Sequence, residues 1–461
     1  MVASGLIAID STILATAVPS IVDDVGGFSQ FPWLFSIYLL AQAVAVPVYS
    51  KLADMIGRKP IILFGIALFL VGSVLCGFAW SMPALIAFRA VQGLGAGAVG
   101  PVAFTMVGDI YTVEERARVQ GYLASVWAIS AVVGPTLGGL FAQFTGWPWI
   151  FFINVPLGLL AVILIVRNFH EKVEKKKHRI DFAGAALLMG ALTLLILGLL
   201  EGGQAWEWGS PTSVAIFVVG GALLTAFLLV ERRAAEPILP SWPFTRRLLL
   251  TTTLVAFAIG AVLIGLTSYI PTYLESAVDA PPIVAGLALA ALTIGWPLAV
   301  TFVGRVYLRI GFRTTVLIGA VITVAAALAY ALTANSPSVV TIAVISFFMG
   351  AGLGTTTSPA LIAAQASVGW SERGVVTGTN LFARNVGSAV GVAVLGAIAN
   401  AIIGGFPGTN SNPDAVVAAT GAVFWAVVIG SVLALIAALA MPKTPVPRRD
   451  PVTGEISTSA P

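Results

Sequence analysis

Three charged residues lie within or beside long apolar stretches of the sequence: Asp10, Arg89 and Arg384. Charged side chains at membrane depth are costly, and they usually face a cavity or a partner of opposite charge on an ion or substrate pathway. Desolvation disfavours a carboxylate anion, so a proton could bind to Asp10 and later leave it. We therefore predict proton coupling by Asp10 and Arg89. Two alternatives stay open, a structural ion pair for Asp10 and an interfacial, snorkelling Arg89.

Further polar and aromatic side chains within apolar stretches could line a substrate cavity. Cationic compounds are often captured by a carboxylate together with aromatic rings. The candidates are Tyr38, Gln92, Trp127, Trp296, Asn380, Arg384 and Asn385. The last three are spaced to share one helical face, and Arg384 fits a gating role as well as a cavity role. Each aromatic residue could equally be a packing residue.

These residues require membrane-spanning helices to position them. A hydrocarbon core of about 30 Å takes roughly 20 apolar helical residues to cross. Fourteen stretches of the chain qualify, and only 10% of all residues are charged. They cover 1–21, 33–52, 60–79, 82–106, 119–143, 149–167, 182–201, 211–230, 248–272, 283–304, 312–333, 338–361, 379–402 and 415–441. The sequence therefore predicts an all-α polytopic membrane protein with fourteen transmembrane helices.

The basic residues fix the expected orientation. Of the 24 Lys and Arg residues, all except Arg89 and Arg384 lie in alternate loops, next to these loops or in the C-terminal tail. Because basic loops stay in the cytoplasm, both termini are predicted to be cytoplasmic. This asymmetry also accounts for the formal charge of +4, so nucleic acid is not an expected partner. The first span has no basic flank before it, and we expect it to be retained rather than cleaved as a signal.

An internal repeat divides the chain into two halves. Gly57 and Lys59 recur as Gly311 and Arg313 at an offset of 254 residues, while Glu115-Arg116 recurs as Glu372-Arg373 at 257. Repeats of this kind are typical of membrane carriers with a central site. The predicted organisation is a six-helix half (1–167), a cytoplasmic linker (168–181), an inserted helix pair (182–230), a second linker (231–247), a second six-helix half (248–441) and a disordered cytoplasmic tail (442–461).

The loop between the second and third spans carries a recognisable motif at Lys51 to Lys59. Asp54 ends a helix and could meet a helix N-terminus and basic groups across the two halves, as a polar latch with Arg58 and Lys59. Gly57 permits the tight turn. In the second half Leu308 replaces Asp54, so the latch is expected on one side. The motif resembles that of the major facilitator superfamily, although a simple cytoplasmic anchor is the alternative.

Four further motifs extend this resemblance over nearly the whole chain. Leu85 to Gly97 resembles the family's membrane-embedded arginine motif, and Gly134, Pro135, Gly138 and Gly139 resemble the helix signature of its antiporters. Proline bends such a helix, while the glycines give a smooth packing face. Stretches beginning at Ile9 and Trp149 are similar to the fourteen-span drug:proton antiporter branch. The resemblance implies two six-helix halves with an inserted hairpin.

The resemblance further implies secondary active export of drugs or other amphipathic molecules by proton antiport in a bacterial cytoplasmic membrane. No phosphate-binding loop of the G-x-x-x-x-G-K-S/T kind occurs, so the proton gradient is the expected energy source and no cofactor is expected. Expected partners are the substrate, protons and membrane lipids, with the protein as a monomer. An exporter of lipids or cell-envelope precursors remains an alternative, and a proton-coupled importer is a further one. Neither a catalytic constellation nor a metal site is expected.

Overall fold

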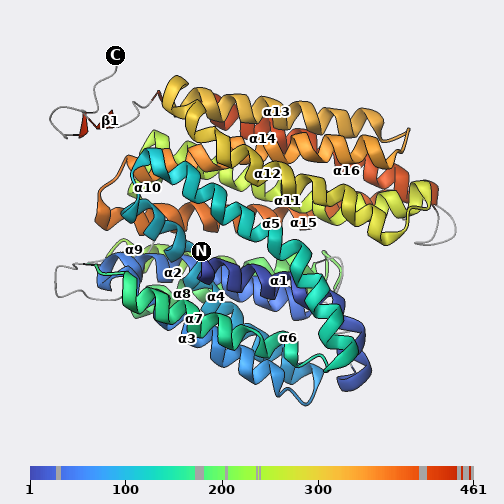
Figure 1. Ribbon diagram of the computed structural model, residues 1–461, viewed down its shortest axis with the longest axis horizontal. Coiled ribbons are helices and arrows are strands. Elements are labelled where there is room, and N and C mark those ends of the chain that lie inside the picture. The colour runs from blue at the N-terminus through green and yellow to red at the C-terminus, as the bar shows by residue number, and fades with distance from the viewer. Residues whose placement is uncertain are drawn as a thin grey trace.

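In the computed structural model the chain forms a bundle of long helices (Figure 1). The structure describes residues 1–461 except 27–32, 172–180, 203–205, 235–236, 238–239, 404–412, 444–447, 450–455 and 458–461. The first part comprises α1 (Val2–Val25), α2 (Trp33–Ile56), α3 (Arg58–Gly77), α4 (Met82–Ile110), α5 (Val113–Phe144), α6 (Trp149–Phe152) and α7 (Asn154–Asn168). It is followed by α8 (Phe182–Glu201) and α9 (Pro211–Glu231).

The second part contains the remaining elements. They are α10 (Trp242–Thr245), α11 (Arg247–Val278), α12 (Pro282–Ile310), α13 (Phe312–Thr333), α14 (Val339–Ala366), the 3-10 turn η2 (Trp370–Glu372), α15 (Arg373–Ile403) and α16 (Pro413–Ala440). In the tail, which was expected to be disordered, β1 (Arg448–Arg449) pairs antiparallel with β2 (Ile456–Ser457). Most other tail residues lie outside the described part of the chain.

The two parts form two halves that lie side by side. In Figure 1 the N-terminal half, α1 to α7, lies below the C-terminal half, α11 to α16. Each half has its own apolar core: one centres on α3 and α4 with Phe69, the other on α11 to α14 and α16 with Phe424. The pair α8 and α9 packs on itself, and α8 also contacts α2 of one half and α15 of the other.

Twelve helical segments within the described residues are long and apolar enough to cross a membrane. All fourteen predicted stretches are helical, but α1 and α5 are not among these twelve. In α1 only the shorter apolar stretch Val2–Leu14 is found, which is below the length of a candidate span. In α5 the first turns carry the charged residues Glu115, Arg116 and Arg118. The fourteen-span prediction is therefore supported only as far as a multi-pass helical bundle with twelve candidate spans.

Glycines on α4 determine how closely α2 and α3 approach this helix. A side chain at Gly93 would collide with the backbone of Tyr38 on α2, and one at Gly95 with the backbone of Phe69 on α3. Such small residues let helices pack closely in membranes. Gly57, with a φ of 107°, makes the tight turn between α2 and α3, as predicted.

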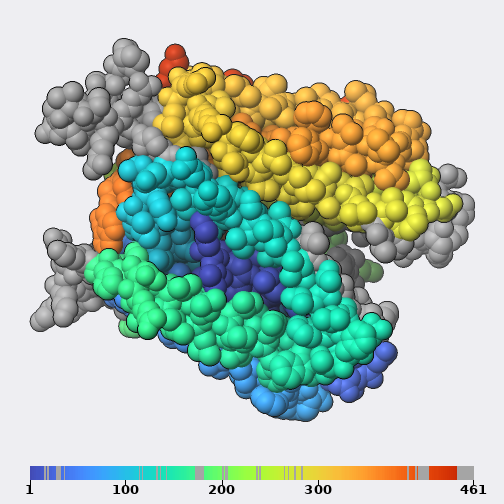
Figure 2. Space-filling view, viewed as in Figure 1, coloured from blue at the N-terminus to red at the C-terminus, as the bar shows by residue number. Residues whose placement is uncertain are grey.

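The two halves are held together at one end of the bundle. Within the described residues, the hydrogen bonds between them gather where α5 and α15 begin, beside the basic loops. Figure 2 shows the halves in contact at this end, with the surface hollowed between them toward the opposite end. We call the closed end the basic-loop end.

Candidate functional site

The carboxylate of Asp10 accepts hydrogen bonds from three side chains inside the N-terminal half. Arg89 Nη1 lies 2.8 Å from Asp10 Oδ2, and the two residues form an ion pair with each side chain only 1% exposed. Gln92 Nε2 and Asn154 Nδ2 donate to Asp10 Oδ1 at 2.8 and 2.9 Å. A buried charge requires such pairing and hydrogen bonding. We call Asp10, Arg89, Gln92, Asn154 and Ser73 the buried polar network.

Ser73 fixes the two amides that face Asp10. Its hydroxyl accepts from Gln92 Nε2 at 3.0 Å and from Asn154 Nδ2 at 2.8 Å, and it donates to the carbonyl oxygen of Phe151 at 3.0 Å. The hydroxyl hydrogen is thereby committed to a carbonyl, so both oxygen lone pairs remain for the amides. This arrangement presents the amide hydrogens to the carboxylate.

Arg89 is held on its other sides as well. Nε donates to the carbonyl oxygen of Leu34 at 3.2 Å, and Nη1 donates to Gln92 Oε1 at 2.6 Å. The guanidinium carbon lies 4.2 Å from the centroid of the Tyr38 ring. A guanidinium stacked on an aromatic face gains a cation–π attraction. Arg89 is thus a buried partner of Asp10 and not a snorkelling residue.

Four helices supply this network. Asp10 comes from α1, Ser73 from α3, Arg89 and Gln92 from α4, and Asn154 is the first residue of α7, after the break that separates α7 from α6. Loss or gain of one charge on Asp10 would therefore act on contacts between four elements. The arrangement ties these four helices to one carboxylate.

A second charged cluster lies at the basic-loop end, between the halves. Arg58 bridges Asp54, at 2.7 Å, and Asp109, at 2.9 Å, and its own side chain is fully buried. Arg373 of the C-terminal half donates to Asp109 Oδ1 at 3.0 Å and to the carbonyl oxygen of Gly108 at 2.8 Å. We call Asp54, Arg58, Asp109 and Arg373 the half-interface cluster.

The Asp54 carboxylate also caps a helix of the opposite half. Gly374 N and Val375 N, in the first turn of α15, donate to its two oxygens at 2.9 and 2.7 Å. The first amides of a helix have no partner within the helix and carry the positive end of its dipole. Arg58 adds a hydrogen bond to the carbonyl oxygen of Trp370 and stacks on its ring at 3.8 Å.

Lys59, predicted as a third member of the latch, lies elsewhere. Its ammonium donates to the carbonyl oxygens of Val166 and Phe169, at the end of α7 in the same half. Adjacent helix positions point about 100° apart, so Arg58 and Lys59 at the start of α3 face different neighbours. Lys59 therefore joins α3 to α7 and does not reach Asp54.

The matching loop of the C-terminal half makes a weaker contact. Tyr307 donates its hydroxyl hydrogen to the carbonyl oxygen of Val113, at the start of α5, at 2.5 Å. Two polar contacts between the halves lie nearby: Ser358 with Gln120, and Gln365 with the carbonyl oxygen of Phe104. Leu308, the counterpart of Asp54, brings no carboxylate to this surface.

The glycine motif of α5 packs against α1. A side chain at Gly134 would collide with Thr12, whose hydroxyl donates to the carbonyl oxygen of Ser130. Gly138 is buried, whereas a side chain at Gly139 would meet open space. The side chain of Pro135 lies outside the described residues.

The predicted cavity residues are divided between several places. Tyr38 and Gln92 belong to the surroundings of Asp10. Trp127 on α5 is 43% exposed, and Trp296 on α12 is half-buried. Asn380, Arg384 and Asn385 lie along α15, far in sequence from the buried polar network.

Several residues of the two sites were missed by sequence reasoning. Ser73 and Asn154 complete the surroundings of Asp10, while Asp109 and the amides of Gly374 and Val375 complete the half-interface cluster. Asn154 lies in the stretch beginning at Trp149 that resembles the antiporter branch, so this motif could have indicated it. Ser73 looks like an ordinary small residue of an apolar helix, and backbone amides carry no sequence signal.

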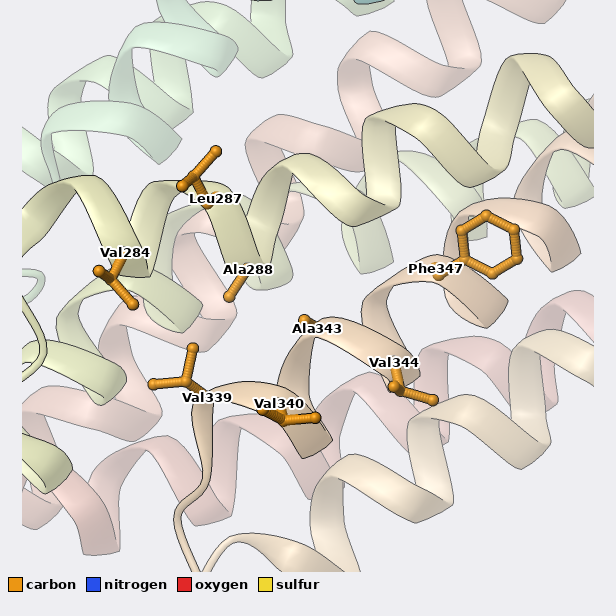
Figure 3. A pocket seen from close by; sticks show the side chains of 8 residues that line it. All are labelled: Val284, Leu287, Ala288, Val339, Val340, Ala343, Val344 and Phe347. Carbon is orange, nitrogen blue, oxygen red and sulfur yellow. The ribbon is translucent and has the colours of Figure 1, made fainter.

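An apolar groove of about 390 Å³ lies between α12 and α14 near their first turns. Its lining is hydrocarbon throughout and includes Val284, Leu287, Val340 and Phe347 (Figure 3). None of these side chains can hold a proton or pair with a charge. Unlike the buried polar network and the half-interface cluster, the groove therefore offers only apolar contacts.

The two helical halves and the pair α8 and α9 together hold the twelve candidate spans of the described residues. With the buried ion pairs, they define a multi-pass membrane protein with polar sites inside and between its halves. A model of the Major Facilitator Superfamily matches residues 1–392. Multidrug resistance protein 3 of Bacillus subtilis (strain 168) is 36% identical over 395 residues, which cover 85% of this chain and 76% of that protein. The chain therefore belongs to the Major Facilitator Superfamily.

Two further comparisons agree with this assignment. Multidrug transporter protein MdtP of Bacillus subtilis (strain 168) is 31% identical over 394 residues, which cover 86% of this chain and 73% of that protein. The solved structure of the proton:xylose symporter XylE has a TM-score of 0.66 at 12% identity, covering 96% of this chain and 94% of that one, and shows the likeness of fold. Family membership makes the protein a membrane transporter and not an enzyme.

Proposed function

We propose that the protein is a proton antiporter that exports drugs or other amphipathic small molecules by alternating access. The observation that carries the proposal is the buried pair of Asp10 and Arg89, surrounded by hydrogen-bond donors from four helices. Intramembrane ionisable residues of this kind are typical of proton relays. The names of the two Bacillus relatives support multidrug substrates.

The proposed coupling step is a change of charge on Asp10. A proton that enters from the outer side neutralises the carboxylate and removes the ion pair with Arg89. The amides of Gln92 and Asn154 then lose an anionic acceptor, and the contacts among α1, α3, α4 and α7 change with it. Release of the proton on the inner side restores the ion pair. The proton gradient is the energy source, and no cofactor is needed.

The proposed gate is the half-interface cluster. Closed contacts at the basic-loop end and the hollow at the other end support an outward-open arrangement if the basic loops are cytoplasmic (Figure 2). Opening to the cytoplasm then requires Asp54 to leave the start of α15 and Arg373 to leave Asp109. Alternating access is in this view an exchange between this closed cluster and closure at the outer end.

The proposed membrane arrangement has fourteen spans, with α1 and α5 added to the twelve candidates and with α8 and α9 as an inserted pair. Contacts of α1 with α5 and α4 inside the N-terminal half support the addition. Both termini would lie in the cytoplasm of a bacterial cell. The proposed partners are the substrate, protons and membrane lipids, with a monomer as the working unit and no role for nucleic acid.

The test is transport in inverted membrane vesicles under an imposed pH gradient, with ethidium as the substrate and a pH-sensitive dye in parallel. We expect ethidium uptake into the vesicles together with proton release from them. Asp10→Asn should abolish gradient-driven uptake, while Asp23→Asn, an exposed carboxylate near the end of α1, should transport normally. Full gradient-driven transport by Asp10→Asn would disprove the assigned coupling residue.

A further inference from the structure

Arg384 is a cation inside the bundle that has no counterion within the described residues. It lies eleven residues after the start of α15, which is roughly 16 Å along the helix and near mid-membrane. In the part of the chain that the structure describes, its guanidinium forms neither an ion pair nor a hydrogen bond, and it is half-buried. A guanidinium carries five hydrogen-bond donors and stays charged in proteins. Its charge therefore needs an acceptor from outside these residues.

Arg384 lies on a different face of α15 from Gly374 and Gly378, which approach Asp54 and Ser50 of the other half. Thr377, seven residues earlier, contacts Gln365 of α14, and Gln365 in turn reaches the carbonyl oxygen of Phe104 on α4. Seven residues are almost two full turns, so Arg384 lies on the same face of the helix as Thr377. Arg384 thus lies almost two turns further along α15 from the basic-loop end than Thr377.

A second unpartnered donor lies beside it on the helix. Asn380 is one turn before Arg384, and its Nδ2 is buried without a hydrogen-bond partner in the described part of the chain. The residue is 9% exposed. Residues four apart are neighbours on a helix surface. Burying an amide without a partner costs free energy, so the two side chains together form an incomplete set of donors.

The carboxylates elsewhere in the protein do not complete this set. Asp10 is occupied by Arg89 and two amides, and Asp54 and Asp109 are occupied at the half-interface cluster. From α11 to α15 the acids of the sequence are Glu275 and Asp279, at the end of α11 away from the basic loops, and Glu372 just before α15. Glu372 pairs with Arg246. Among the described residues, Arg384 and Asn380 therefore keep unpartnered donors and a positive charge.

We propose that Arg384 and Asn380 bind the anionic head group of an amphipathic substrate, a carboxylate, sulfonate or phosphate. The proposal rests on the proposed function and adds anionic amphipaths to its substrate class. Guanidinium groups bind such anions in pairs of parallel hydrogen bonds, and an amide donor can add a third. The anion can come from a soluble compound or from an anionic lipid.

The test is binding of three dansyl-labelled probes to the purified full-length protein in nanodiscs of phosphatidylcholine, followed by fluorescence. The probes share an undecyl chain and end in a carboxylate, a methyl ester or a trimethylammonium group. We expect the carboxylate to bind roughly tenfold or more tightly than the other two, because hydrogen bonds to charged groups are the stronger ones. Equal affinities of the carboxylate and the ester would overturn the proposal.

Substitutions connect this preference to the residues. Arg384→Gln should remove the preference for the carboxylate and leave the affinity for the ester unchanged, and Arg384→Lys should keep part of it. Asn380→Ala should weaken carboxylate binding less. Arg305→Gln removes an exposed arginine of α12 and should bind all probes like the wild type. An unchanged carboxylate affinity in a folded, monodisperse Arg384→Gln variant would contradict the assignment.

A competition experiment with an anionic lipid distinguishes the two sources of the anion. If an anionic lipid is the natural ligand, phosphatidylglycerol in the nanodisc should compete with the carboxylate probe in the wild type and not in Arg384→Gln. If a soluble amphipath is the ligand, phosphatidylglycerol should have no effect on the carboxylate preference. The vesicle assay with ethidium tests proton antiport independently, so failure of the anion site leaves that result standing.

Discussion

The two halves begin their interface helices in two different ways. α5 and α15 both start at the basic-loop end, each beside a Glu-Arg pair: Glu115-Arg116 lies inside α5, and Glu372-Arg373 joins η2 to α15. α5 satisfies its own first amides through a capping box, in which Thr112 accepts from Glu115 N and the Glu115 side chain accepts from Thr112 N. α15 receives its cap from Asp54 of the other half.

The sequence repeat shows where this difference arises. The offset of 257 that joins Glu115 to Glu372 takes Thr112 to Gly369. The backbone is nearly the same at both positions, with φ −65° and ψ 163° at Thr112 and φ −67° and ψ 170° at Gly369. What changed is one side chain. Gly369 offers no hydroxyl to Glu372 N, and Asp54 of the other half instead accepts from Gly374 N and Val375 N, so the start of α15 is coupled to closure of the halves.

The largest effect on the gate is expected from Asp54→Asn. The change removes the anion that caps α15 and leaves Arg58 and Arg373 to share Asp109. Breaking a buried ion pair by removing one partner costs about 3–5 kcal/mol. We expect the basic-loop end to open, with a longer distance between spin labels at Arg167 and Arg309 in a Cys76→Ala background, and a transport rate reduced at least about tenfold.

The matched control is Asp23→Asn, which removes an exposed carboxylate at the opposite end of the bundle and should leave both measurements unchanged. An unaltered label distance in Asp54→Asn would show that closure does not depend on the cap that Asp54 provides to α15. The proposed difference between α5 and α15 would then be wrong.

Gly369→Thr should have an intermediate effect, because it gives α15 the hydroxyl that α5 has. The backbone at Gly369 is already that of an N-cap, and no atom lies within 4 Å of the added Cβ. The new hydroxyl would accept from Glu372 N, as Thr112 accepts from Glu115 N, and would contribute about 1 kcal/mol. It would keep the start of the helix capped when Asp54 leaves Gly374 and Val375, and so would stabilise the open arrangement. The label distance should shift part of the way toward that of Asp54→Asn. Gly369→Ala lacks the acceptor and should behave as wild type; an equal shift there would attribute the effect to lost flexibility.

The elements of this comparison were predictable from sequence to different degrees. Apolar length located every long helix, and the repeated Glu-Arg pair revealed the two halves. Asp54 was predictable as a latch residue because a simple cytoplasmic anchor needs basic residues and no acid. Its partners were not, since Gly374 and Val375 contribute backbone amides, and Asp109 looks like any acid at a helix end. Asp10 and Arg89 were each found, but their pairing depends on how α1 packs against α4.

A smaller effect is expected from Tyr307→Phe in the C-terminal half. The hydroxyl makes one neutral hydrogen bond across the interface, to the carbonyl oxygen of Val113. Such a bond contributes about 0.5–1.5 kcal/mol. We expect a modest rise in transport rate or none, and a label distance close to wild type. A shift as large as that of Asp54→Asn would show that the two sides of the interface contribute equally to the latch.

The smallest effect on the gate is expected from Thr112→Ala. This change removes the capping hydroxyl of α5, which is absent at the corresponding position Gly369 before α15. Loss of an N-cap costs about 1 kcal/mol of stability, so the thermal unfolding midpoint of the purified protein should fall. The lost contact lies within one half and is present whether the halves are open or closed, so it cannot bias the equilibrium between them. The label distance should therefore stay at the wild-type value. A lower midpoint with unchanged distance separates a cap that stabilises a helix from a cap that closes an interface; an altered distance would mean that α5, too, depends on closure.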